Sequence, residues 1–189
     1  MSEQQANDLT IVRYGHPALR QPAARVGRIG EEVRRLVAAM VRAMRAAGGL
    51  GLAANQVGVP RRVAVVEYEG KLISLVDPEI VSMKGSQLAD EGCLSLPKLY
   101  GQVARPTQVV VRARDLSGRR VKIKAEGLLA RALCHEVDHL EGRLFVDRVE
   151  EPSLYWLMGT NEEGHPLIQP TTLDDALKVF TAAHRPREA

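Results

Sequence analysis

The sequence has little cysteine and no long apolar run, and both shortages narrow the class of protein. Cys93 and Cys134 are the only cysteines in 189 residues, which excludes a disulfide framework and fits a reducing compartment. No stretch of about 18 apolar residues occurs, so we expect no membrane span. The N-terminal residues lack the basic flank and the apolar segment of a secretory signal. A cytoplasmic protein is expected.

The sequence also lacks a large charge excess and the glycine spacing of a nucleotide-binding loop. A net charge of +3 permits weak attraction to anions, but without a concentrated basic face we expect no sequence-specific nucleic-acid binding. The glycine-rich stretch 48–60 matches neither a phosphate loop nor a dinucleotide fingerprint. No repeat or linker divides the chain, so residues 1–189 are expected to form one domain with flexible ends at 1–10 and 184–189.

Apolar periodicity predicts three helices. Residues 31–47 carry an apolar face at helical spacing and are followed by Gly48-Gly49, which stops a helix. A second helix is expected to begin at Glu126 and to end at Gly142. A short third helix is expected over 172–183, capped by Thr172.

Between the first two helices, β-branched and alternating residues predict antiparallel strands. These strands are expected over 61–68, 72–76, 79–83, 108–114 and 119–124. Asp77-Pro78 is expected to break the strand that begins at Leu72, and residues 85–97 are expected to form a strand or loop edge. The order of elements indicates an α+β fold.

The second helix contains His135-Glu-Val-Asp-His139, the pattern His-Glu-x-x-His. At ~3.6 residues per turn, His135 and His139 lie on one helical face and can bind one metal ion. Glu136 is placed to act as a base for an attacking water without being a ligand. Two imidazoles, a cation and a nearby carboxylate suit metal-assisted hydrolysis of a carbonyl compound.

The residues leave the third protein ligand open. Cys93 is one candidate, because a thiolate suits iron, zinc or nickel, although a lone cysteine is more often an apolar core residue. Cys134 has the same apolar interpretation. Downstream residues are the other candidates: Glu141, Asp147, Glu150, Glu151, Glu162 and His165. Gln56, taken by itself, is expected to be a turn residue that points at solvent.

Three motifs together resemble the signature motifs of the peptide deformylases, in the same order and at similar separations. They are Gly49-Leu-Gly-Leu-Ala-Ala-Asn-Gln56, Glu91-Gly-Cys-Leu-Ser95 and His135-Glu-Val-Asp-His-Leu-Glu-Gly142. Tyr14-Gly-His-Pro-Ala-Leu-Arg20 is similar to the opening of that family. The resemblance runs from about Tyr14 to about Val149, and it implies antiparallel strands packed around the central motif helix.

The resemblance implies a role for each matching residue. Cys93, His135 and His139 would bind the metal, natively Fe(II) and often Zn(II) or Ni(II) in preparations. Glu136 would be the general base, and the Gln56 amide and the Leu94 N–H would donate to the substrate's carbonyl oxygen. The reaction would remove the N-formyl group from the initiator methionine of a nascent chain and release formate.

An apolar pocket is expected to select methionine. Helical spacing before His135 nominates Ala132 and Leu128, and the glycine-rich loop contributes Leu50, while Gly51 would bond the peptide through its backbone. Arg131 is expected to snorkel to the mouth of the pocket and meet the substrate backbone.

Glu91 and Arg105 are candidates for orienting the metal ligands. The sequence supports equally well the interpretation that they form an ion pair on the surface. After Pro97, Tyr100 stands where the family commonly has an arginine that contacts substrate.

The family further implies a transient ribosome contact, which we do not assign to the C-terminal segment with Asp174, Asp175 and Lys178. Two alternatives remain. A zinc endopeptidase would use the same helix without needing Cys93. A non-enzymatic, metal-stapled binding module would leave Glu136 without a task.

Overall fold

The computed structural model describes residues 9–182, and the flexibility expected of residues 1–8 and 184–189 lies outside that range. Leu9, expected to be loosely packed, contacts the core. Within the described range three α-helices are present, as expected, within about a residue or two of the expected bounds. They are α1 (Glu31–Ala46), α2 (Gly127–Leu140) and α3 (Leu173–Ala182). Short 3-10 turns occupy Pro17–Arg20, Ala54–Val57 and Phe145–Asp147.

Nine strands form two antiparallel sheets among the described residues. The larger sheet has the order β1-β2-β3-β6-β7, from β1 (Gly51–Ala53), β2 (Val63–Tyr68), β3 (Lys71–Lys84), β6 (Gln108–Arg114) and β7 (Arg120–Glu126). The smaller sheet has the order β4-β5-β8-β9, from β4 (Gln87–Cys93), β5 (Leu96–Arg105), β8 (Tyr155–Thr160) and β9 (Pro166–Pro170). The expected α+β class is confirmed.

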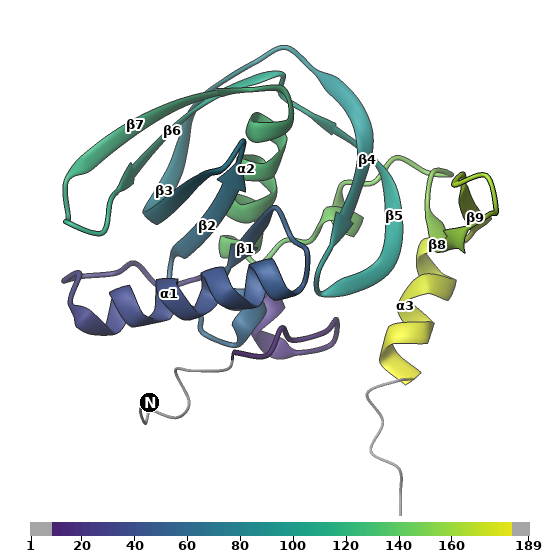
Figure 1. The fold of residues 1–189 in the computed structure, drawn as a ribbon, viewed down its shortest axis with the longest axis horizontal. Helices are drawn as coiled ribbons and strands as arrows, with labels where there is room; N and C mark the ends of the chain where they lie inside the picture. Colours follow the sequence, from purple (N-terminus) through teal and green to yellow (C-terminus); the bar gives the residue numbers. More distant parts are fainter. Residues whose placement is uncertain (1–8, 183–189) are drawn as a thin grey trace, which may run out of the picture.

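The motif helix α2 lies at the centre, between the larger sheet and the β4–β5 arm (Figure 1). Ala130 and Leu133 of α2 pack against Val109 and Val111 of β6. On the other side of the sheet, α1 packs against β1 and β2. The strand β2 is therefore buried on both faces, which explains its continuous apolar run Val63–Val66.

The expected break at Asp77-Pro78 is a bulge within one continuous strand. The pairing of β3 with β6 shifts register between Val76 and Glu79, and Asp77 takes a left-handed φ of 53°. The Asp77 carboxylate accepts hydrogen bonds from the Val26 N–H at 2.9 Å and from Arg114 at 2.5 Å. These hydrogen bonds stabilise the left-handed backbone conformation of Asp77, which aspartate adopts more readily than most residues. The strand therefore continues past the bulge, and pairing with β6 resumes at Glu79.

Four strands were not predicted from the sequence. The strand β1 has three residues, and β5 carries Pro97, a left-handed Lys98 and Gly101, which obscure alternation. The hairpin β8–β9 is largely exposed, and its apolar residues 155–158 and 167–168 do not alternate with polar ones. It extends the smaller sheet through the pairs Leu99↔Trp156 and Tyr100↔Tyr155. Among the described residues, no helix has the length and apolarity needed to cross a membrane.

Candidate active site

The two histidines of α2 converge with a cysteine from the end of β4. His135 Nε2 lies 3.2 Å from His139 Nε2, and Cys93 Sγ lies 3.2 Å from the same His139 nitrogen. One donor atom from each residue lies within 4.8 Å of the others. Ligands of a common tetrahedral ion with metal–nitrogen distances of ~2.0–2.1 Å are separated by similar distances.

The end of β4 brings Cys93 to the helix. Pairing between β4 and β5 shifts register between Gly92 and Cys93, which turns the chain towards α2. A Cβ at Gly92 would lie 2.6 Å from the Tyr100 ring, so a glycine is required for this close approach. Local backbone geometry, rather than residue spacing, therefore supplies the third donor.

The chemistry of this group fits a metal ion. Two imidazole nitrogens facing each other repel unless a cation or a proton lies between them. Burial and the neighbouring His135 lower the pKa of His139 well below its usual value, so this imidazole is neutral and able to bind a metal. The alternative ligands do not join the group within the described part of the chain: Glu141, Asp147, Glu150, Glu151, Glu162 and His165.

A buried charge network orients the first histidine. Glu91 Oε2 lies 3.1 Å from His135 Nδ1, which leaves Nε2 for a metal. Arg105 binds Glu91 through two hydrogen bonds of 2.8 and 2.9 Å and reaches Asp138 at 2.5 Å. Burial raises the pKa of Glu91, but the hydrogen bonds from His135 and Arg105 outweigh it and hold that pKa well below its usual range. The Glu91–Arg105 pair is thus buried, and the surface interpretation is wrong.

The orientation predicted for Arg131 is also wrong. Arg131 lines the pocket, but it is only 5% exposed and its guanidinium faces the protein interior. It donates to Glu91 at 2.8 Å and to the carbonyl oxygens of Val103 and Gln87. These partners satisfy the buried charge, so the side chain does not extend to the mouth.

Sequence reasoning missed two further members of this network. Arg148 binds both oxygens of Asp138, at 2.6 and 2.7 Å. The charge of Asp138 beside the apolar Val137 was the available signal, because a buried charge needs partners.

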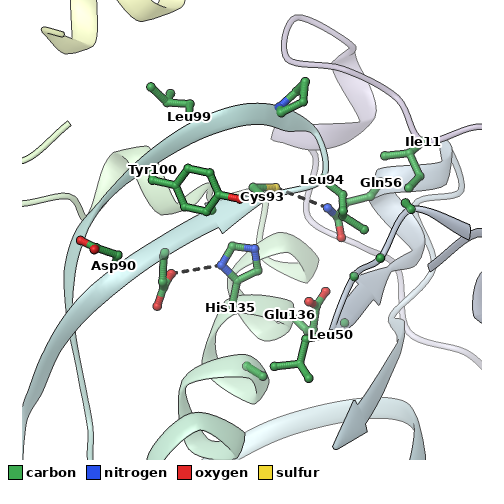
Figure 2. Close-up of a pocket in the computed structure, with 18 of the residues that line it drawn as sticks. Ile11, Leu50, Gln56, Asp90, Cys93, Leu94, Leu99, Tyr100, His135 and Glu136 are labelled. Atoms are coloured by element: carbon green, nitrogen blue, oxygen red, sulfur yellow. Dashed lines mark hydrogen bonds and ion pairs between the residues drawn. The ribbon is translucent and has the colours of Figure 1, made fainter. Parts of the chain in front are cut away.

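Gln56 is buried rather than solvent-facing, being 1% exposed. Its Oε1 accepts a hydrogen bond from the Ala53 N–H at 2.9 Å, which fixes the orientation of the amide. The Nε2 group is consequently aimed at the metal-ligand group, 3.4 Å from Cys93 Sγ (Figure 2). A neutral donor is therefore held beside the candidate metal centre.

Glu136 packs directly against the glycine-rich strand β1. A Cβ on Gly51 would lie 2.3 Å from Glu136 Oε1, so the carboxylate occupies space that a glycine leaves open. Glu136 Oε2 is buried and has no hydrogen-bond partner among the described residues. Burial raises the pKa of Glu136 to about 7, although the neighbouring His135 lowers it. A carboxylate with an unused oxygen and a pKa near neutrality suits proton transfer.

A cavity of about 640 Å³ opens onto these groups. The predicted residues Leu50, Leu128 and Ala132 line it, with Leu128 at the rim because it is 53% exposed. Ile11, Arg13, Asp90 and Leu99 are among the lining residues that were not predicted. Tyr100, noted in the sequence only for its departure from the family, lines it as well.

The N-terminal segment lines the cavity with Ile11 and Arg13 and joins two of the segments that border it. The Val12 N–H donates to the Gln56 carbonyl at 2.8 Å, and the Tyr14 N–H donates to the Ser95 carbonyl at 3.0 Å. Arg13 Nη1 donates to the Leu94 carbonyl at 2.8 Å. The loops that carry Gln56 and Leu94 are thereby held together.

A family model described as polypeptide deformylase matches residues 8–154. The chain belongs to the peptide deformylase family. A peptide deformylase of Thermomicrobium roseum is 48% identical over 163 residues, which cover 82% of this chain and 93% of that protein. One of Dictyoglomus thermophilum is 46% identical, covering 76% and 94% respectively. The enzyme is therefore a metal-dependent hydrolase that removes the N-formyl group from nascent peptides, and neither the endopeptidase nor the binding-module alternative is supported.

Solved structures agree with this assignment. A peptide deformylase of Synechococcus elongatus, crystallised with actinonin, superimposes with a TM-score of 0.75 at 42% identity, covering 77% of this chain and 82% of that one. A peptide deformylase of Legionella pneumophila gives 0.74 at 40% identity, covering 76% and 87%. The enzyme thus shares both sequence and fold with the family.

Proposed function

We propose that the cavity is the deformylation site and that Cys93, His135 and His139 bind its metal. The observation that carries this proposal is the convergence of one sulfur and two nitrogens beside a buried carboxylate with an unused oxygen. A site that closed all four metal positions with protein ligands would be structural, whereas three donors leave one position for chemistry.

The metal, when bound, acts as a Lewis acid that polarises the formyl carbonyl and acidifies water. Glu136 accepts the proton of the attacking water and passes it to the leaving nitrogen. Gln56 Nε2 and the Leu94 N–H donate to the oxygen on which negative charge develops. Removing one such donor typically raises the barrier by ~3 kcal/mol. The fixed amide of Gln56 supports this role, because it needs no rearrangement to donate.

The methionine side chain is proposed to bind among Leu50, Leu128 and Ala132. All three line the cavity, and two of them lie on the turns of α2 that precede His135. The Gly51 backbone is proposed to bond the peptide. We do not include the Arg131 guanidinium in substrate binding, because its donors are engaged by protein oxygens.

The proposed native metal is Fe(II), with Zn(II) or Ni(II) able to replace it. A thiolate with two imidazoles accepts several divalent ions, and availability decides among them. Cytoplasmic location and a transient encounter with the ribosome follow from the formylated nascent substrate and remain part of this proposal.

The test is formate release from a formyl-methionyl tripeptide by anaerobically purified enzyme. We expect Cys93→Ala to lose both metal and activity, and Glu136→Gln to keep metal while losing at least about 100-fold in kcat. The matched control is Cys134→Ala, which removes the other buried thiol and should retain metal and activity. Retention of metal by Cys93→Ala would contradict the ligand assignment.

A further inference from the structure

The C-terminal part of the structure lies beyond the family match, which ends at residue 154. The hairpin β8–β9 begins at Tyr155 and adds to the edge of β5 through two residue pairs. The helix α3 then packs beneath it through Trp156 and Phe180, whose ring centroids are 5.4 Å apart. This segment pairs with β5 through the hairpin and packs against Tyr14 through Phe180 of α3.

One residue of the added hairpin contacts two residues of the substrate cavity. The Tyr155 ring stacks on the Tyr100 ring, with centroids 5.9 Å apart and an interplanar angle of 17°. The Tyr155 hydroxyl donates to Asp90 Oδ2 at 3.1 Å. Burial and the Asp90 carboxylate raise the pKa of Tyr155 to about 12, so the hydroxyl stays protonated and remains a donor.

Tyr100 and Asp90 belong to one wall of the cavity. Both line it, and Figure 2 shows them across Cys93 and His135 from Leu50 and Gln56. The Tyr100 ring covers Gly92, the residue before Cys93, closely enough to leave no room for a Cβ. The ring is therefore held between Gly92 of β4 and Tyr155 of β8.

We propose that Tyr155 is a positioning residue that fixes the Tyr100 ring and the Asp90 carboxylate as a substrate-binding wall. The added hairpin thereby sets the affinity of the enzyme for the peptide, without touching the reacting atoms. This inference rests on the proposed function, because it assigns the cavity to the formylated peptide.

The expected effect of losing the stack follows from the strength of aromatic pairs. Such pairs contribute enough to change an equilibrium by about two- to ten-fold. Tyr155→Leu should raise KM for a formyl-methionyl tripeptide by that factor. The value of kcat should stay within about two-fold, because Glu136 and the metal ligands do not contact Tyr155.

The experiment is a double-mutant cycle with Tyr155→Leu, Tyr100→Leu and the double variant, each assayed for KM, kcat and metal content. If Tyr155 acts through Tyr100, its substitution has little further effect on KM in the Tyr100→Leu background. Tyr155→Phe keeps the stacked ring and should preserve most of the affinity for the peptide. A folded Tyr155→Phe variant with near-normal KM shows that the change in Tyr155→Leu comes from loss of the ring. Thr172→Ala is the matched control, because it removes the hydrogen bond from the Asp175 N–H that caps α3 in the same segment, and it should lower Tm while leaving KM unchanged.

Three results would overturn the inference: an unchanged KM in Tyr155→Leu, an equal rise in KM for Thr172→Ala, or full additivity in the cycle. An inert wild-type enzyme would instead contradict the proposed function, so the two failures are distinguishable.

Discussion

Gly51 and Glu136 show how one missing Cβ leaves room for the carboxylate that we propose as the general base. The Glu136 carboxyl group lies against the β1 backbone. Any residue larger than glycine at position 51 would clash with it. The side chain is buried, so it cannot swing into solvent to avoid a collision. Its distance from the substrate is thus set by the glycine-rich strand as much as by the helix.

We expect Gly51→Ala to displace the Glu136 carboxylate and to lower kcat by about 100-fold or more. The reason is that a general base must lie within hydrogen-bond distance of the proton that it accepts. The assay is formate release with metal content measured in parallel. Gly27→Ala is the control, since a Cβ there meets no atom within 4 Å. Equal activity of the two variants would show that Glu136 tolerates the shift.

At the scale of elements, the site depends on ion pairs that join β4, β5 and α2. Arg105 lies between Glu91 and Asp138, and all three are buried. Removing the arginine would leave two carboxylates buried without their shared partner. Breaking a buried pair in this way is far more costly than losing an exposed one.

Arg105→Met is therefore expected to lower the free energy of unfolding by about 3–5 kcal/mol and to weaken metal binding by about 10- to 100-fold. Urea unfolding and competition with a chelator measure the two effects. Arg45→Met removes the exposed pair with Glu67 and should have a much smaller effect on stability and none on metal affinity. Similar losses in both variants would argue against a special role for the buried network.

The turn between β6 and β7 offers a pH test away from the metal. Hydrogen bonds from the Ser117 side chain, and further ones from Arg119, lower the pKa of Asp115 to about 2. In an unfolded chain this pKa is ~3.9. The stabilisation is therefore fully present above pH ~4 and is lost as the pH falls towards 2.

We expect the stability difference between wild type and Asp115→Asn to shrink as the pH falls from about 5 to about 3. Urea unfolding at several pH values measures it. A difference that is constant with pH would mean that the ionised Asp115 does not stabilise the turn.

The sequence predicted the elements that carry strong patterns and missed those defined by tertiary contacts. Periodicity was sufficient for α1, α2, β2 and β6, because each buries a regular face. It was insufficient for β5 and β8, where a left-handed Lys98, Gly101 and exposed residues break the pattern. Likewise, helical spacing placed Arg131 at the cavity mouth. The oxygens that accept its hydrogen bonds in the interior come from β4 and β5, which spacing along the helix does not indicate.

At the scale of the molecule, the candidate metal joins two sheets. Cys93 belongs to the smaller sheet, whereas the histidines lie on α2, which packs on the larger one. A bound ion would cross-link them and stabilise the folded state by mass action, by about 2.7 kcal/mol at a free concentration of 100 Kd.

Metal removal should therefore lower Tm and speed amide hydrogen exchange selectively in β4 and the second half of α2. The pairs of β2 with β3 serve as the internal control, since no candidate ligand lies on them. A uniform increase in exchange over the whole chain would indicate that the ion does not act as a local cross-link.

The bridging segment at the N-terminus has a practical consequence for protein engineering. Val12 and Tyr14 hold the Gln56 and Ser95 loops through their backbone N–H groups, so side-chain substitutions there leave the bridge intact. Cleavage between them, or a circular permutation that opens the chain at Arg13, would separate the loops. New termini are better placed in the exposed Glu69–Gly70 turn, which joins β2 and β3 away from these loops.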